Sequence, residues 1–347
     1  MKTTFCSSRL CNIPGVFYPT TILSVDDDQV AIDAVIAALA GYYKTISFLD
    51  SNKALDFLTD KTGKFFRGRA ISNKIDEGVL GFRKEAYNDK RFDDVLIAII
   101  DYDMPEQSGF DVWQHVGLND YYQSHEHSYI LFTAKKYSDF QEELANEAVG
   151  KNFISKFDPN HPKYLIEAIN KLSTGMFQRV GHGIANILNH DESEKTSFLN
   201  DGNFLSILNP YLQEHDICEG YLFDKQGSLM FLDNKANLSW LFVRNEQGVQ
   251  NSIERARTYG APDSVIASLK SKEMILSLYE KEDFESRKSI DWDKYLLKAS
   301  VFKDEGKELE VFEHRPSDYY YAFTDSFPEH GIDKDKILSY DDFLRQK

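Results

Sequence analysis

Five polar residues in the first half of the chain have the types and spacing that phosphoryl transfer requires. They are Asp26, Asp27, Asp101, Thr133 and Lys156. If these side chains converge, the three carboxylates form a dense negative patch that is costly without a cation. Mg²⁺ suits that patch, because it accepts carboxylate oxygens and bridges to phosphate. A metal-neutralised Asp101 could then attack a phosphoryl group and form an acyl phosphate. Lys156 and Thr133 would stabilise the phosphate oxygens.

Short apolar runs, four of which directly precede these residues, predict the sheet that positions them. The runs cover residues 21–25, 45–49, 95–100, 129–132 and 152–155. They are rich in β-branched and aromatic residues and lack helical periodicity, as buried parallel strands do. Helical stretches alternate with them, at residues 29–41, 52–59, 110–118, 138–149 and 162–172. This alternation predicts a doubly wound five-stranded parallel α/β sheet. In such sheets ligands bind at the carboxyl ends of the strands, where all five polar residues fall.

A single aspartate at a strand end is an ordinary turn or cap residue, so no one of these residues specifies the chemistry. Asp28, the third residue of the acidic run, is the one that we expect to cap the following helix. The joint occurrence of the polar residues, in this order and on these strands, favours a phosphoacceptor site.

Four motifs resemble those of bacterial response-regulator receiver domains. They lie at residues 23–28, 100–105 with Gly109 following, 132–134 and 153–156, and the resemblance covers residues 20–172. It implies that Asp101 is the phosphoacceptor and that Asp27 and Asp101 hold Mg²⁺ together with the backbone carbonyl of Asp103. Asp26 would reach the metal through water. Thr133 and Phe153 would form the switch that follows phosphorylation.

The same resemblance implies partners. A sensor histidine kinase or a phosphotransfer protein would deliver the phosphoryl group to Asp101. Phosphorylation would favour a homodimer through the face built by the fourth helix, fifth strand and fifth helix. The receiver would catalyse only its own phosphorylation and dephosphorylation, so we do not expect an enzyme with an external substrate.

Three features depart from the receiver pattern. Phe157 follows Lys156 where the family usually has proline, so the geometry of this loop is left open. An insertion at residues 63–92 is basic and punctuated by aromatic residues, and we interpret it as a solvated surface excursion rather than a docking site. The N-terminal extension, residues 1–19, is expected to be peripheral.

An enzyme is the competing interpretation. An apolar strand followed by Asp101, Tyr102 and Asp103 also matches the opening motif of haloacid-dehalogenase-type phosphatases, which form an aspartyl phosphate as well. In that family the motif comes first and an acidic pair lies downstream. Here the acidic pair lies upstream, and this order favours the receiver.

The second half predicts a different fold. Residues 173–200 are expected to form a helical linker with a break or a softened helix at residues 173–175, and His182 in it is interpreted as a linker histidine. Residues 201–347 predict an α+β output domain with a mainly antiparallel, possibly PAS-like sheet. Its strands are expected at residues 221–223, 229–232, 238–243, 292–303, 309–314 and 319–324. Its helices are expected at residues 248–259 and at 263–272, the latter capped by Asp263.

The excess of acidic residues limits which ligands this output domain can bind. Residues 173–347 hold 21 Lys and Arg against 31 Asp and Glu, and the formal net charge of the whole chain is −16. A DNA-binding output is therefore disfavoured. The aromatic residues of the last strands are interpreted as core, with a pocket near His314 and Arg315 as the alternative. An output that binds or converts a nucleotide stays open.

Length and output together also resemble the response regulators of bacterial α-hydroxyketone quorum-sensing circuits. No apolar run approaches the length of about 20 residues that a membrane helix needs, and the N-terminus lacks a signal pattern. The cysteines, Cys6, Cys11 and Cys218, form no close pair and are expected to be reduced. These features predict a cytoplasmic protein without membrane partners.

Overall fold

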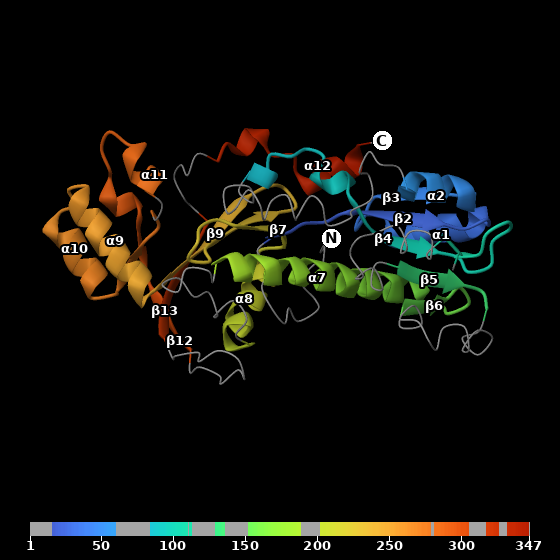
Figure 1. Cartoon of the computed structure of the whole chain (residues 1–347), viewed down its shortest axis with the longest axis horizontal. Helices are drawn as coiled ribbons and strands as arrows, with labels where there is room; N and C mark the ends of the chain where they lie inside the picture. The colour runs from blue at the N-terminus through green and yellow to red at the C-terminus, as the bar shows by residue number, and fades with distance from the viewer. Residues whose placement is uncertain are drawn as a thin grey trace.

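The computed structural model contains a five-stranded sheet and a six-stranded sheet joined by one long helix, together with a small two-stranded sheet (Figure 1). It describes residues 16–59, 84–109, 111–112, 129–135, 152–188, 202–278, 281–304, 317–325 and 332–346. The predicted helices at residues 110–118 and 138–149 lie outside these ranges, apart from residues 111–112. The insertion at residues 63–92 is described only from residue 84, and there the expectation of a solvated surface excursion is wrong, because Ala86, Arg91 and Phe92 are fully buried.

The first sheet is the predicted five-stranded parallel sheet, in the order β3-β2-β4-β5-β6. Its strands are β2 (Thr21–Val25), β3 (Thr45–Phe48), β4 (Val95–Ile100), β5 (Tyr129–Thr133) and β6 (Phe153–Ser155). The strand β2 lies between β3 and β4, so the strand order reverses beside it. The carboxyl ends of β2 and β4 therefore meet at a topological switch point, where doubly wound sheets bind their ligands.

Two short helices of this half also agree with the prediction. They are α1 (Gln29–Leu39), which buries Ile32, Val35 and Leu39, and α2 (Ser51–Thr59). Asp28 caps α1 as predicted, because its side chain accepts a hydrogen bond from the backbone N–H of Val30 at 2.9 Å. The site residues at the end of β2 are thus followed directly by a helix start.

A single helix, α7 (His161–Leu188), replaces the two helices and the break predicted at residues 173–175. The predicted break is wrong because packing outweighs the helix preference of the local residues. Ser173 and Thr174 are buried, and the ring of Phe177 lies edge-on to Tyr18 at 5.2 Å. A glycine within a helix costs only about 1 kcal/mol relative to alanine, which such burial offsets. The helix therefore runs without interruption from the parallel sheet toward the second sheet (Figure 1).

The second sheet has six strands in the order β1-β7-β8-β9-β13-β12, all paired antiparallel. Its strands are β1 (Val16–Phe17), β7 (Ile217–Leu222), β8 (Leu229–Asp233), β9 (Leu238–Asn245), β12 (Ser300–Asp304) and β13 (Ser317–Thr324). The predicted α+β fold with a separate antiparallel sheet is confirmed.

The strand β1 corrects the expectation that the N-terminal extension is peripheral. Val16 and Phe17 pair with β7 and are buried. A side chain at Gly220 would place its Cβ 2.2 Å from the ring of Phe17, so the glycine makes room for that ring. Residues just before the parallel sheet thus complete the edge of the second sheet.

The remaining elements of the second half differ from the prediction in detail. They are α8 (Gly202–Glu214), α9 (Glu246–Thr258), α10 (Asp263–Lys270), α11 (Lys281–Glu285), α12 (Tyr340–Arg345) and a small sheet of β10 (Met274–Leu276) and β11 (Leu296–Lys298). The N-cap residue of α10 is Pro262, not the predicted Asp263, and it makes no side-chain capping hydrogen bond. The strand predicted at 292–303 is divided into a 3₁₀ turn (Trp292–Lys294), β11 and β12. The strand predicted at 309–314 lies outside the described residues.

Helices α9, α10 and α11 gather at the end of the molecule farthest from the parallel sheet (Figure 1). None of the helices in the described ranges combines the length and apolar character needed to cross a membrane.

Candidate functional site

The acidic residues that follow β2 and β4 converge as the sequence predicted. One carboxylate oxygen each of Asp26, Asp27 and Asp101 lies within 4.8 Å of the others. The backbone N–H of Asp101 donates to the carbonyl of Val25 at 2.9 Å, which fixes the ends of the two strands side by side. Asp26 and Asp101 are buried, whereas Asp27 is exposed. The cluster therefore opens to solvent on the side of Asp27.

The chemistry of this cluster fits Mg²⁺. Carboxylate oxygens are the ligands that this ion prefers, and three are available here. Oδ1 of Asp101 is buried and has no hydrogen-bond partner among the described residues. A buried carboxylate oxygen without a partner is costly unless a cation or a donor approaches it. Asp26, Asp27 and Asp101 are therefore the residues that could hold the metal.

Lys156 joins the two buried carboxylates. Its Nζ lies 2.7 Å from Oδ2 of Asp26 and 3.1 Å from Oδ2 of Asp101. Burial alone would lower the pKa of Lys156, but the hydrogen bond with Asp26 and the charge of Asp101 raise it above its ordinary value. Burial raises the pKa of Asp26, although Lys156 opposes that effect. A protonated Lys156 thus offsets part of the negative charge at the site.

The hydroxyl position predicted at Thr133 ends the neighbouring strand β5. The side chain of Thr133 is fully buried, and its Oγ1 accepts a hydrogen bond from the backbone N–H of Lys135 at 3.3 Å. The carbonyl of Thr133 accepts from the N–H of Lys156 at 2.9 Å, which sets the ends of β5 and β6 in register. Phe153, the predicted aromatic partner of the switch, begins β6 and is partly buried.

Asp103 differs from the other aspartates. Its carboxylate is not part of the acidic cluster and pairs instead with Nζ of Lys135 at 3.2 Å, where the side chain of Asp103 is exposed and that of Lys135 is partly buried. The same Nζ lies 4.9 Å from the ring centre of Tyr102. Sequence reasoning gave no role to Lys135, because no pattern in the chain connects it to Asp103. A metal contact through the backbone carbonyl of Asp103 stays a prediction.

Gly109 has a steric role at the site. A Cβ at this position would lie 2.0 Å from the backbone oxygen of Asp101, which no real contact allows. The N–H of Gly109 also donates to the carbonyl of Tyr102 at 3.0 Å. Only glycine therefore lets the loop after β4 fold back against the predicted phosphoacceptor.

The loop that follows Lys156 is ordered without the proline of the receiver pattern. The N–H of Phe157 donates to Oγ of Ser155 at 3.3 Å, and the N–H of Asp158 donates to the carbonyl of Ser155 at 3.2 Å. The side chain of Phe157 is 79% exposed, so it makes little contact with the site. The replacement of proline by Phe157 thus leaves Lys156 in contact with both carboxylates.

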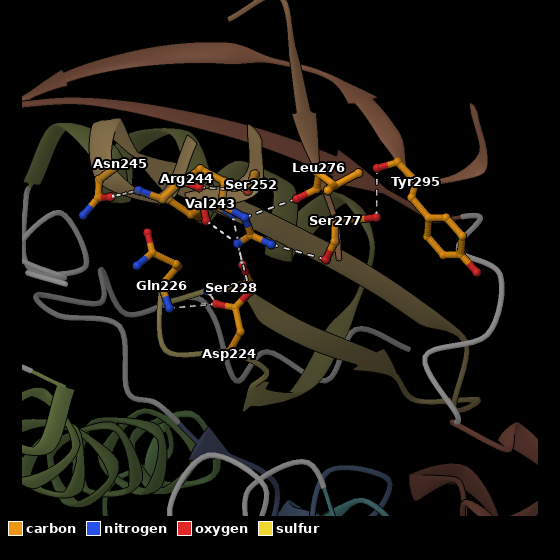
Figure 2. Close-up of polar contacts among 11 residues, drawn as sticks. Asp224, Gln226, Ser228, Val243, Arg244, Asn245, Ser252, Leu276, Ser277 and Tyr295 are labelled. Atoms are coloured by element: carbon orange, nitrogen blue, oxygen red, sulfur yellow. Dashed lines mark hydrogen bonds and ion pairs between the residues drawn. The ribbon is translucent and has the colours of Figure 1, made fainter. Parts of the chain in front are cut away.

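A second polar cluster lies in the output half and surrounds Arg244 (Figure 2). The guanidinium is fully buried and donates to Oδ2 of Asp224 at 2.8 Å and to Oγ of Ser228 at 2.9 Å. It also donates to the carbonyls of Leu276 and Ser277, both at 3.2 Å. These bonds join β9 to the β7–β8 turn and to the small sheet, so the cluster is structural.

The aromatic residues of the last strands are core, as predicted. Those described and buried are Trp292, Tyr295, Phe302, Tyr319 and Tyr320. The alternative pocket near His314 and Arg315 lies outside the described residues. His182 lies within α7, and its side chain is not among those described.

The parallel sheet with its acidic cluster, followed by an antiparallel α+β half, is the fold of a response regulator. Among solved structures, the chain is similar to the Legionella pneumophila response regulator LqsR, with 23% sequence identity and a TM-score of 0.72 over 98% of this chain and 97% of that one. At this identity the likeness shows the fold, which includes the output half. The expected receiver fold is confirmed.

Two further solved structures match a smaller part of the chain. The bacteriophytochrome response regulator AtBRR has 17% identity and a TM-score of 0.31, over 45% of this chain and 94% of that one. A response regulator receiver domain protein from Clostridium thermocellum has 15% identity and a TM-score of 0.30, over 45% and 96%. The sequence matches no protein-family model and no curated protein sequence.

Proposed function

We propose that this chain is a phosphorylation-activated response regulator that accepts a phosphoryl group on Asp101. The observation that carries the proposal is the geometry of that carboxylate. One of its oxygens contacts Lys156 at 3.1 Å, while the other, Oδ1, is buried without a hydrogen-bond partner among the described residues. Asp101 therefore presents a carboxylate oxygen without a hydrogen bond beside a lysine, as a phosphoacceptor requires.

The chemistry follows from the positions of the side chains. A carboxylate oxygen of Asp101 forms a bond to phosphorus, and the bond from phosphorus to the donor atom breaks with its electron pair going to the donor. Asp26, Asp27 and Asp101 would hold Mg²⁺, which would neutralise part of the negative charge of the carboxylates and of the phosphoryl group. Lys156 and the hydroxyl of Thr133 donate hydrogen bonds to the phosphoryl oxygens. Water later hydrolyses the acyl phosphate and restores the carboxylate.

The partners in this proposal are a sensor histidine kinase or a phosphotransfer protein, acting in the cytoplasm. Phosphorylation favours a homodimer, and the output half acts by binding a protein or a small ligand. Its excess of acidic residues supports an output other than direct DNA binding. The resemblance of length and output to regulators of α-hydroxyketone circuits supports a place in quorum sensing.

Light scattering during size-exclusion chromatography tests activation and dimerisation together. With Mg²⁺ and acetyl phosphate we expect the wild-type molar mass to rise toward twice that of one chain. Asp101→Asn should not respond. The control is Asp33→Asn, which changes an exposed aspartate on α1 outside the cluster and should respond like the wild type. A response of Asp101→Asn equal to that of the wild type contradicts the proposal.

A further inference from the structure

The C-terminal segment at residues 332–346, which we call the strap, lies across the junction between the two sheets. It contains α12, which Figure 1 places between them. The hydroxyl of Tyr340 donates to the backbone carbonyl of Tyr42, just after α1, at 2.6 Å. The backbone N–H of Asp333 donates to the hydroxyl of Tyr87 at 2.8 Å. The last residues of the chain are therefore bound to the receiver half.

Apolar contacts reinforce this docking. Tyr340 and Phe343 are buried, and the centres of their rings each lie 5.1 Å from the ring centre of Phe92, just before β4. Nζ of Lys44 lies 4.7 Å above the ring of Phe343. Removal of the strap from the receiver would expose all three rings to water.

The strap also holds the output half. The backbone N–H of Asp341 donates to the carbonyl of Asn234, in the β8–β9 turn, at 3.0 Å. Nζ of Lys334 donates to Oδ1 of Asn237 in the same turn at 2.7 Å. One segment thus contacts both halves of the molecule.

An ion pair beneath the strap joins the halves directly. Nε and Nη2 of Arg91, in the receiver half, lie 2.8 and 3.1 Å from the two carboxylate oxygens of Glu219 on β7. Both side chains are 0% exposed. Nη2 of Arg91 also donates to the carbonyl of Leu338 in the strap at 2.6 Å. A single guanidinium therefore binds the receiver, the output sheet and the strap at once.

The position of this pair connects it to the phosphorylation site. Arg91 lies shortly before β4, and Asp101 directly follows that strand. Opening of the junction would break the bonds of Arg91 to Glu219 and to Leu338 and would let water reach both charges, so the pair sets the relative position of the halves more than it adds net stability. The rings covered by the strap would be exposed as well. The junction is thus built to stay closed while chemistry occurs at the far end of β4.

We propose that the strap and the Arg91–Glu219 pair lock the receiver and output halves into one rigid body, which stays closed in both phosphorylation states. If the two halves stay together, phosphorylation must act by changing how copies of the chain associate, and this consequence rests on the proposed function. Phosphorylation does not act by separating the two halves of one copy.

Electron paramagnetic resonance between two spin labels tests the rigid body. The labels are placed at Lys53→Cys on α2 and Lys270→Cys on α10, two exposed positions in opposite halves, with Cys6 and Cys11 changed to serine. Dilution with unlabelled protein removes distances between copies. We expect one narrow distance peak that does not move on addition of Mg²⁺ and beryllofluoride. A shift larger than the width of the peak overturns the proposal.

Occupancy of the site is measured on the same sample by fluorine NMR. A bound-beryllofluoride signal that is absent from Asp101→Asn shows that a constant distance belongs to the loaded protein. If no signal forms in the wild type, the proposed function fails. The role of the strap is then still tested by the following variants, which need no phosphate analogue.

Variants of α12 test the strap. Tyr340→Ala removes a buried ring and should broaden the distance peak and speed hydrogen exchange across the strap by at least tenfold. Tyr340→Phe keeps the ring, loses only the bond to Tyr42, and should show a smaller increase. Arg345→Ala, on the exposed side of the same helix, should match the wild type. A narrow peak and unchanged exchange in Tyr340→Ala would show that the strap does not hold the halves together.

Discussion

Arg91 and Glu219 form a bidentate ion pair in which both side chains are fully buried, although they belong to different halves of the molecule. Burial of an ion pair has a large desolvation cost, so its net contribution to stability is small. Removal of one partner has a much larger effect, because the other charge is left without compensation. The pair is therefore sensitive to single substitutions.

We expect Arg91→Met to lower the free energy of unfolding by about 3–5 kcal/mol. The double variant Arg91→Met with Glu219→Leu should recover most of that loss, because no buried charge remains. The control is Lys163→Met, which breaks an exposed pair with Glu167 on α7 and should cost less than about 0.5 kcal/mol. Urea unfolding measures all three. An Arg91→Met variant within about 1 kcal/mol of the wild type would show that Glu219 finds another partner.

Substitutions of the neighbouring residues Asp27 and Asp28 should distinguish a metal ligand from a helix cap. Asp27→Asn removes one carboxylate of the acidic cluster, so we expect about tenfold or more weaker Mg²⁺ binding. Asp28→Asn keeps an oxygen that can cap α1, since asparagine and aspartate cap equally well, and should bind Mg²⁺ like the wild type. Calorimetric titration with Mg²⁺ compares them. Equal losses in the two variants would contradict the assignment of Asp27.

Substitution of two glycines by alanine should have different effects, a loss of phosphoryl labelling at Gly109 and a gain in stability at Gly175. Gly109→Ala places a Cβ against the backbone of Asp101, so the loop must move, and phosphoryl labelling should fall at least tenfold. Gly175→Ala meets no atom within 4 Å in α7 and should raise the free energy of unfolding by about 0.5–1 kcal/mol. Labelling with acetyl phosphate and thermal unfolding measure the two effects. Wild-type labelling in Gly109→Ala would show that this loop does not position Asp101.

Substitution of Asp103 should distinguish a response regulator from a phosphatase. Its carboxylate pairs with Lys135 outside the acidic cluster, so Asp103→Asn should retain labelling of Asp101 within about threefold. In a haloacid-dehalogenase-type phosphatase the same carboxylate would be the general acid, whose removal costs about 10²–10⁴-fold in rate. Hydrolysis of p-nitrophenyl phosphate by the wild type, lost in Asp103→Asn, would support the phosphatase instead.

The parallel sheet and its site were predictable because the signals were local. Each strand of the first half is a short apolar run, and the residue that follows it lies at the carboxyl edge of the sheet by topology alone. Asp26, Asp27 and Asp101 therefore came together as the sequence predicted. The contact of Lys156 with two carboxylates agrees with its expected place beside them.

The junction was not predictable, because its contacts join segments far apart in the chain. Arg91 is one of many basic residues in the predicted insertion, and only the fold brings it to Glu219. The pairing of Val16 and Phe17 with β7, and the continuity of α7 through Gly175, likewise depend on packing between the halves. The local sequence predicted a peripheral N-terminal extension and a helix break, whereas tertiary contacts decide the structure at both places.

Mass spectrometry after incubation with Mg²⁺ and acetyl phosphate tests the central claim most directly. We expect the wild-type chain to gain the mass of one phosphoryl group, located by peptide mapping on Asp101. Asp101→Asn should gain none, and chelation of Mg²⁺ should abolish the gain in the wild type. A phosphoryl group on Asp101→Asn, or on another residue of the wild type in place of Asp101, would contradict the assignment of the phosphoacceptor.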